Sequence, residues 1–360
     1  MEKCRSAYIH IPFCNTICSY CDFCKFLKNT EWVDKYLIEL NKEISSTYKG
    51  EVLDTLYIGG GTPTSLDINE LNRLFDTLKL FKLNNTYEFT FECNIESITE
   101  EKLKLLKENR VNRISIGVET FNDKHLNFLN RHHTKESTLK TIDLVKKYFD
   151  NINIDLMYAI PGETLKELES DIDILLSLNI PHISTYSLII EENTKLYIDK
   201  TEYIDDELDS DMYTLIIDKL KDFNHYEVSN FSKPGFESKH NLTYWNNDNY
   251  YGFGCGSSGY IDNIRYDNTR SLTKYLKGEY IYTSNKLSKE ETIQNEFILG
   301  LRKMKGINKN TFKSKYNIDI KSIDTVNKLL SENKIIEDRD NIFINPKYIY
   351  TSNYILEEFI

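Results

Sequence analysis

The sequence predicts an α/β protein built on parallel strands, and two observations support this class. Short apolar segments rich in β-branched and aromatic residues alternate with amphipathic helical segments over residues 6–190. Such alternation implies parallel pairing with right-handed crossovers. Polar or flexible residues also follow several of the apolar segments, as they do at the strand ends that form α/β active sites. Six strands of this kind can form an open sheet or an incomplete barrel, and the pattern leaves both open.

The strands and helices of this first part can be placed by residue. Runs of β-branched and aromatic residues mark the strands, and apolar residues at a period of about 3.6 mark the helices. The predicted strands are Ala7–Pro12, Leu53–Ile58, Tyr87–Cys93, Arg113–Val118, Ile152–Met157 and His182–Leu188. The predicted helices cover residues 31–48, 67–80, 98–109, 135–148 and 163–178.

The sequence changes character after Leu188. Residues 226–266 are rich in glycine and aromatic residues, which predicts short strands and close turns that extend the same sheet. We expect a core domain over 1–190, a sheet extension over 191–285, and a small, mainly helical or winged-helix-like domain over 286–360. The other expected elements are helices over 206–222, 271–281, 289–304, 309–316 and 321–333, and a hairpin near 338–341.

Composition excludes several classes of protein. The chain has 360 residues, of which 40% are hydrophobic and 28% charged, so collagen-like, low-complexity and wholly disordered chains are ruled out. A net charge of -11 argues against a basic nucleic-acid-binding surface. No apolar stretch approaches the roughly 20 residues that a spanning helix needs, and residues 1–5 lack the apolar region of a signal peptide. We expect a cytoplasmic protein with no membrane span and no nucleic-acid partner.

Four of the seven cysteines lie within eleven positions near the start of the chain. Cys14, Cys18 and Cys21 have the spacing C-x3-C-x2-C directly after the first predicted strand. In a reducing compartment this clustering favours metal or cluster ligation over disulfides. Three thiolates can hold three irons of a cubane cluster and leave the fourth iron without a protein ligand. The alternatives are a zinc site with Cys24 as fourth ligand, although structural zinc commonly uses two separated pairs, and a four-cysteine ferredoxin-type cluster.

Several motifs resemble one known family. The segments Tyr8–Cys14 and Cys18–Phe23 are similar to the cluster loop of radical S-adenosylmethionine proteins. More narrowly, they resemble the oxygen-independent coproporphyrinogen III oxidase-like family and its haem chaperone branch. The resemblance covers about residues 7–270 and implies a partial (βα)6 barrel. Further matching segments are Gly59–Thr64, Ser115–Phe121, Asn153–Tyr158, and His240-Asn241 with Tyr244-Trp245.

The resemblance also implies cofactors and the residues that bind them. Cys14, Cys18 and Cys21 would hold a [4Fe-4S] cluster, and S-adenosylmethionine would chelate its open iron. The reduced cluster would then cleave the sulfonium to methionine and a 5′-deoxyadenosyl radical. Glycines at 60 and 61 would permit close approach of the cofactor, although a tight strand-to-helix turn is the other interpretation of this segment. The residues implied to line the cofactor pocket are Tyr8, Tyr20, Gly60, Gly61, Thr62, Glu92, Glu119, Arg131 and Asp155.

Two positions depart from the family pattern. Glu119 stands where the family usually has Gln, which removes two hydrogen-bond donors and adds charge. If the family resemblance is set aside, Glu119 and Arg131 can be interpreted as a surface ion pair. Glu92 can then be interpreted as an ordinary solvated strand end. Cys24 lies one position later than the additional cysteine of the oxidase branch, and we expect it to be either a free thiol or a thiol that lies beside the cluster ligands without binding iron. Cys255, like the other two isolated cysteines, is expected to be a small buried apolar residue.

The same comparison points to the haem chaperone branch. Thirteen residues precede Cys14, and the loop reads Cys21-Asp22-Phe23 rather than Cys-Gly-Cys. The segment from His240 to Trp245 is typical of that branch, and His240 is a candidate haem ligand, with a hydrogen-bonded core histidine as the alternative. We expect haem, haem-accepting proteins and a reductant protein such as flavodoxin or ferredoxin as partners. The competing functions are oxidative decarboxylation of coproporphyrinogen III propionates by a radical, and a zinc or ferredoxin-like module.

Overall fold

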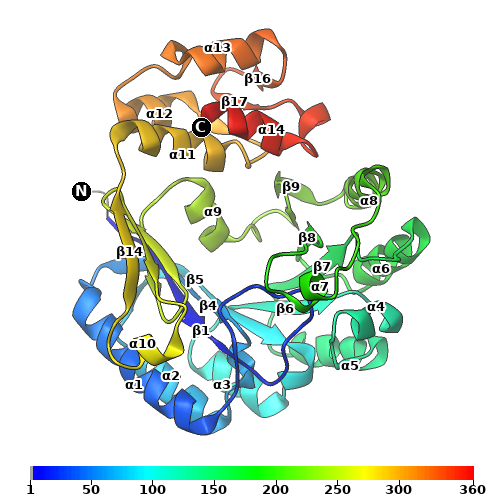
Figure 1. The fold of residues 1–360 in the computed structure, drawn as a ribbon, viewed down its shortest axis with the longest axis vertical. Coiled ribbons are helices and arrows are strands. Elements are labelled where there is room, and N and C mark those ends of the chain that lie inside the picture. The colour runs from blue at the N-terminus through cyan, green and yellow to red at the C-terminus, as the bar shows by residue number, and fades with distance from the viewer. Residues whose placement is uncertain (1–2) are drawn as a thin grey trace.

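The computed structural model describes residues 3–360 and is organised around one large, curved, mixed sheet (Figure 1). The sheet has twelve strands in the order β14-β13-β12-β11-β1-β4-β5-β6-β7-β8-β10-β9. Its central six strands pair in parallel. Their order follows the chain without closing on itself, which confirms the partial barrel. These strands are β1 (Ser6–Ile11), β4 (Val52–Gly60), β5 (Lys82–Asn94), β6 (Arg113–Glu119), β7 (Ile152–Tyr158) and β8 (His182–Ser187).

Helices cover the outer face of these strands (Figure 1). Each begins just after a polar residue whose side chain accepts a backbone N–H of the first turn, at Asn29, Asp67, Thr99, Thr134 and Thr164 in turn. Such caps satisfy N–H groups that have no partner within the helix, so they fix where each helix starts. The helices are α1 (Thr30–Thr47), α2 (Ile68–Leu78), α3 (Glu100–Glu108), α5 (Lys135–Val145) and α6 (Leu165–Ser177), with the short α4 (Asp123–Phe128) before α5.

The chain beyond residue 190 extends the sheet at both ends. After α7 (Lys195–Ile198) and α8 (Asp206–Lys219), β9 (Asn224–Glu227) and β10 (Asn230–Ser232) add antiparallel strands beside β8. The chain then crosses to the other end, where β11 (Tyr250–Phe253) pairs in parallel with β1. The remaining strands at that end are β12 (Ser258–Ile261), β13 (Ile264–Asn268) and β14 (Ile281–Lys286).

Two local predictions in this part are wrong. Residues 239–245 form helix α9, which begins after the cap Ser238, although short strands were expected there. A helix was expected over 271–281, but α10 covers only Leu272–Tyr275, and Ile281 begins strand β14. Gly278 adopts φ +81, a conformation that ends the helical path at little cost. Both segments are too short for hydrophobic periodicity to separate helix from strand.

The last part of the chain combines helices with a small separate sheet (Figure 1). Its three strands have the order β15-β17-β16, and β16 and β17 form the hairpin expected near residues 338–341. The division of the chain into three domains stays a prediction. The elements are α11 (Lys289–Gly300), β15 (Ile307–Asn308), α12 (Lys309–Tyr316), α13 (Asp324–Ser331), β16 (Ile335–Glu337), β17 (Asn341–Ile344) and α14 (Ser352–Leu356).

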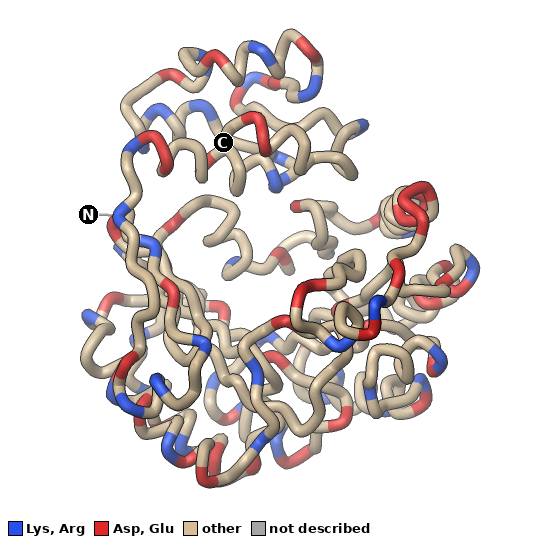
Figure 2. Tube along the Cα trace, viewed as in Figure 1, with Lys and Arg blue, Asp and Glu red and all other residues tan. Residues whose placement is uncertain are grey.

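Charged residues of both signs are distributed over the whole trace. Figure 2 shows Lys and Arg interspersed with Asp and Glu along the described chain. Across residues 3–360, every helix falls short of the length and apolar character that a membrane crossing requires.

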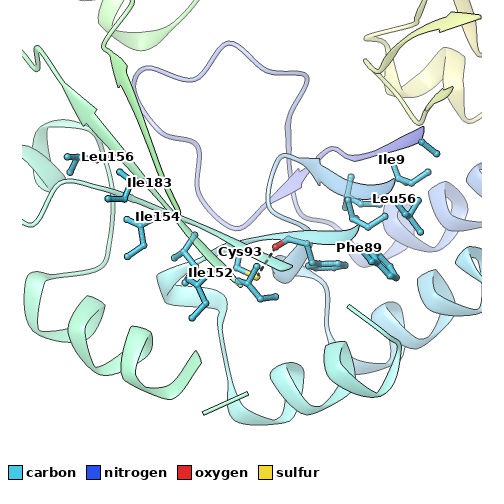
Figure 3. Packing of buried hydrophobic residues seen from close by; sticks show 14 of the residues in the cluster. Ile9, Leu56, Phe89, Cys93, Ile152, Ile154, Leu156 and Ile183 are labelled. Atoms are coloured by element: carbon cyan, nitrogen blue, oxygen red, sulfur yellow. Dashed lines mark hydrogen bonds between the residues drawn. The ribbon is translucent and has the colours of Figure 1, made fainter. Parts of the chain in front are cut away.

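Alternation along the strands separates an apolar outer layer from a polar barrel interior. Ile152, Ile154 and Leu156 of β7 are buried in the core that the helices cover (Figure 3). The residues between them, Asn153 and Asp155, face the other side of the strand, where the Asn153 amide donates to the Asp155 carboxylate at 2.7 Å. The strands therefore present polar groups to the space that they enclose.

Candidate functional site

A pocket of about 140 Å³ lies at the carboxyl ends of the parallel strands. The structure brings to it every residue predicted for the cluster and for S-adenosylmethionine except Tyr8. Tyr186 and Asn94, which no motif indicated, lie there too. The lining residues that sequence analysis predicted are Cys14, Cys18, Cys21, Tyr20, Gly60, Gly61, Thr62, Glu92, Glu119, Arg131 and Asp155.

The loop that carries the three cysteines is held at its base and at its tip. Cys14 ends β2 (Phe13–Cys14), which pairs with β3 (Phe26–Leu27) and so fixes both ends of the loop. At the tip, the backbone N–H of Ser19 donates to the Leu129 carbonyl at 3.0 Å. These contacts hold the cysteines over the strand ends without using their sulfur atoms.

Thr62 and Gly61 shape the space around Cys14. The Thr62 hydroxyl donates to Cys14 Sγ at 3.6 Å, and the Asn94 amide donates to the Thr62 hydroxyl at 3.0 Å. A Cβ atom on Gly61 would lie 2.8 Å from Cys14 Sγ, closer than two such atoms can approach. Glycine at 61 is therefore needed for the cysteine to sit against this turn.

The donor set around the sulfur atoms fits an iron–sulfur cluster. Arg131 is buried, its Nη1 lies 3.7 Å from Cys18 Sγ, and its Nε has no hydrogen-bond partner. Positive donors beside cysteine sulfur are a common way for a protein to stabilise a negatively charged cluster. Within residues 3–360, no three His, Cys, Asp or Glu side chains converge closely enough to hold one metal ion.

Cys24 lies apart from the three cysteines. Its Sγ is 3.7 Å from Cys255 Sγ, and it lines a second pocket on the other side of the loop. Cys24 is thus not placed to act as a fourth ligand, in agreement with its expected role as a free thiol.

Glu92 lies deep in the pocket and is not an ordinary solvated strand end. Its carboxylate accepts from the Tyr57 hydroxyl at 2.7 Å and from the backbone N–H of Gly60 at 3.0 Å. Burial raises the pKa of Glu92 to about 7, although the hydrogen bond from Tyr57 favours the charged form. A Cβ atom on Gly59 would lie 2.7 Å from this carboxylate, so the glycine turn and Glu92 depend on each other.

Glu119 and Arg131 form a buried pair, so the surface ion pair considered from the sequence is wrong. Arg131 Nη2 lies 2.7 Å from Glu119 Oε1, and both side chains are about 95% buried or more. Tyr20 and Tyr186 donate to the same carboxylate at 3.0 and 2.6 Å. A register shift between Gly117 and Glu119, with φ +67 at Glu119, turns this side chain into the pocket.

Asp155 is the third carboxylate of the pocket, after Glu92 and Glu119. It accepts from the Asn153 amide at 2.7 Å and from the Ser115 hydroxyl at 3.4 Å. Burial, followed by repulsion from Glu119, raises the pKa of Asp155 to about 6. Near neutral pH, Glu92 can therefore readily gain or lose a proton. The charge of the Glu119 carboxylate in the same pocket is balanced by Arg131.

His240 and Tyr8 lie outside the cluster pocket. The Nδ1 of His240 is 2.7 Å from the Thr55 hydroxyl, and its Nε2 is 2.8 Å from the Tyr244 hydroxyl. Burial lowers the pKa of His240 to about 3, so its ring is neutral. The structure therefore gives it the hydrogen bonds of a core histidine. Tyr8 donates to or accepts from His10 Nδ1 at 3.0 Å and lines the second pocket.

The second pocket has a volume of about 370 Å³ and an aromatic lining. The guanidinium of Arg270 stands at its edge and donates to the Asp22 carbonyl. Sequence analysis missed Arg270 because it lies in no motif and reaches the cluster loop from 248 positions away. The lining residues that bear on ligand binding are Tyr8, His10, Phe23, Cys24, Tyr244, Tyr250 and Arg270.

Comparison with known proteins agrees with this geometry. Residues 8–175 match the model of the radical SAM superfamily. The chain is 39% identical over 373 residues to heme chaperone HemW of Lactococcus lactis, covering 100% of this chain and 98% of the relative. It is 40% identical over 355 residues to heme chaperone HemW of Bacillus subtilis, covering 94% of each.

A solved structure has the same fold. Coproporphyrinogen III oxidase (HemN) from Escherichia coli, a radical SAM enzyme, superimposes with a TM-score of 0.87 over 99% of this chain and 90% of its own, at 21% identity. The fold and the three-cysteine pocket define a radical S-adenosylmethionine protein, the class that uses a [4Fe-4S] cluster and S-adenosylmethionine. Within that class, the chain belongs to the HemW haem chaperone family.

Proposed function

We propose that this protein is a haem chaperone that binds a [4Fe-4S] cluster, S-adenosylmethionine and haem, and passes haem to acceptor proteins. The observation that carries the proposal is the likeness to HemW proteins over the whole chain, from the cluster loop to the last helices. Likeness to the oxidase at 21% identity concerns the fold alone and does not favour the decarboxylation reaction.

Different residues of the first pocket would bind the [4Fe-4S] cluster and S-adenosylmethionine. Cys14, Cys18 and Cys21 would hold the cluster, and Arg131 would donate to its sulfur atoms through Nη1 and the unpartnered Nε. When bound and reduced, the cluster supplies the electron that cleaves S-adenosylmethionine. Glu92 would accept from the amino or ribose groups of that molecule, and the backbone of Gly60–Thr62, which lines the pocket, would contact it.

The second pocket offers the features that haem binding needs. The rings of Tyr8, Phe23, Tyr244 and Tyr250 provide faces for a flat macrocycle. Arg270 provides a cation for a propionate carboxylate. His240 stays the predicted iron ligand, although it is buried behind this pocket and does not line it. For Nε2 to bind iron, the Tyr244 hydroxyl must give up its hydrogen bond and the ring must become accessible from the pocket.

The remaining partners are proposals of the same kind. A reductant protein such as flavodoxin or ferredoxin would supply the electron for the cluster. The cytoplasmic location and the absence of a nucleic-acid partner stay predictions from composition and charge.

A haemin titration tests the proposal. Anaerobically reconstituted protein is expected to bind haem at one site and to yield no protoporphyrinogen from coproporphyrinogen III. Arg270→Ala is expected to weaken haem binding by about 5- to 10-fold, because it removes one charge-assisted pair. The variant Lys274→Ala on helix α10 removes the same charge outside the pocket and serves as the control. Its affinity for haem is expected to equal that of wild type.

The same titration on His240→Ala decides the iron ligand. Loss of the wild-type haem absorption spectrum at saturating haem supports ligation by His240, and an unchanged spectrum assigns the ligand elsewhere. Turnover of coproporphyrinogen III, or the absence of haem binding, would overturn the chaperone function.

A further inference from the structure

Two cysteines outside the cluster pocket lie in direct contact. Cys24 Sγ and Cys255 Sγ are 3.7 Å apart, although 231 positions separate them in the sequence. Cys24 ends the cluster loop just before β3, and Cys255 lies in the turn that follows β11. Both thiols are free. Neither side chain lines the cluster pocket, so neither sulfur is used by the proposed cofactor chemistry.

The backbone around the pair is arranged for this close approach. A Cβ atom on Gly256 would lie 2.2 Å from Cys24 Cβ, so only glycine lets the turn pack against the loop. Gly256 also has φ +84, which glycine adopts without strain. On the other side, the carbonyl of Cys24 bonds to His10 Nε2 at 2.7 Å. Backbone contacts on both sides therefore hold the two sulfurs close together.

The two sulfurs differ in access and in acidity. Cys255 is completely buried, whereas Cys24 is 7% exposed and lines the aromatic pocket beside Arg270. The hydrogen bond between the two thiols lowers the pKa of Cys24, burial opposes this, and the charge of Arg270 lowers it further. The same hydrogen bond, with burial, raises the pKa of Cys255. The Cys255 thiol also lies 3.1 Å from the Thr269 carbonyl, to which it can donate. Cys24 is thus the accessible nucleophile, and Cys255 is the thiol held behind it.

We propose that Cys24 and Cys255 form a redox-active thiol pair, which a low-molecular-weight disulfide entering the aromatic pocket converts reversibly to a disulfide. The Cys24 thiolate attacks one sulfur of the small disulfide, forms a mixed disulfide and releases one thiolate. Cys255 then loses its proton, attacks Cys24 Sγ and releases the second thiolate. Two protein thiols are oxidised, and one small disulfide is reduced to two thiols. The sulfurs need to approach by less than about 2 Å to reach bonding distance.

The bond would join the end of the cluster loop to the large sheet. It would tie residue 24 to the turn after β11, a strand that pairs with β1 at the centre of the sheet. The loop would then be anchored by a covalent link that does not depend on the cluster. This inference stands on the geometry of the pair and does not rest on the proposed function.

Mass spectrometry after mild oxidation tests the pair. The anaerobic, cluster-loaded protein is treated with bis(2-hydroxyethyl) disulfide, its free thiols are alkylated in acid, and it is digested. We expect a peptide linking Cys24 to Cys255 in most molecules, its loss on addition of dithiothreitol, and faster migration of the oxidised chain on a non-reducing denaturing gel. Absence of the linked peptide, with modification of Cys14, Cys18 or Cys21 instead, would overturn the proposal.

Variants separate the role of Cys24, which attacks the small disulfide, from that of Cys255, which attacks the mixed disulfide. In Cys255→Ser, the reaction should stop at the mixed disulfide on Cys24, seen as one added hydroxyethylthio group. In Cys24→Ser, Cys255 should stay unmodified because the pocket no longer holds an accessible thiol. Cys4→Ser, a buried cysteine whose thiol bonds the Ser6 carbonyl at 3.5 Å, is the matched control and should behave as wild type. Equal labelling of Cys255 in Cys24→Ser and in wild type would contradict the order of attack.

Discussion

Single side chains decide which sulfurs can share a cluster. Cys14, Cys18 and Cys21 line one pocket, whereas Cys24, only three positions further, faces Cys255 across the other side of the loop. The spacing of the cysteines indicated three ligands, but it left a four-thiolate zinc site open. The direction of the Cys24 side chain separates these interpretations, and that direction depends on Gly256, which is distant in the sequence.

Substitution of the cysteines one at a time tests this division. Cys14→Ser, Cys18→Ser and Cys21→Ser are each expected to lose most of the iron and sulfide, because three thiolates are the smallest set that holds the cluster. Cys24→Ser is expected to retain wild-type content. Iron and sulfide analysis after anaerobic reconstitution measures both. If Cys24→Ser loses as much iron as Cys18→Ser, the three-ligand assignment is wrong.

Residue patterns indicated which side chains line the pocket but not how they are paired. Glu92, Glu119, Arg131 and Asp155, which the family resemblance assigned to one pocket, do line the same pocket, and their role in binding a cofactor stays a prediction. The buried pair of Glu119 with Arg131 could not be separated from a surface pair, because a sequence does not reveal burial. The register shift that turns Glu119 inward arises from pairing between strands, which no local pattern encodes.

At the scale of elements, long hydrophobic patterns predicted strands and helices reliably. The six parallel strands and their helices lie close to the predicted positions. The strands have clear runs of β-branched and aromatic residues, and each helix begins after a capping residue. Helix α9 and strand β14 were missed because segments of seven and six residues carry too little periodicity. Their conformation is decided by tertiary contacts, such as the pairing of β14 with β13.

The turn after β7 holds a buried carboxyl group with an unusual proton affinity. Glu163 accepts from the backbone N–H of Ile160 at 3.1 Å through Oε2, while its Oε1 is buried without a partner. Burial raises the pKa of Glu163 to about 8. The folded state therefore binds more protons than the unfolded chain between about pH 4.5 and pH 8. The stability that protonated Glu163 contributes is lost as the pH rises through this window.

Glu163→Gln tests this turn. The variant is expected to be more stable than wild type at pH 9, by about 1–3 kcal/mol, and nearly unchanged at pH 5, because Gln keeps the acceptor but carries no charge. Thermal unfolding of the apo protein at both pH values measures the difference. Glu136→Gln, at a residue that is 78% exposed, is the control and should show no pH-dependent gain. An equal change at both pH values would contradict the account.

At the scale of the whole molecule, one sheet carries both pockets. Strand β1 lies between β4, which leads to the glycine turn of the cluster pocket, and β11, which leads to the turn with Cys255. Repetition of strand and helix predicted the α/β core, and the family resemblance predicted the partial barrel. The parallel pairing of β11 with β1 joins segments more than 240 positions apart, so local sequence patterns could not predict it.

The central claim is that three cysteines leave one iron of the cluster open for S-adenosylmethionine. Electron paramagnetic resonance of the reduced, reconstituted protein, recorded with and without S-adenosylmethionine, tests it most directly. The account predicts that the signal of the reduced cluster changes when S-adenosylmethionine is added, in wild type and equally in Cys24→Ser. Identical spectra with and without S-adenosylmethionine, at full cluster content, would contradict it.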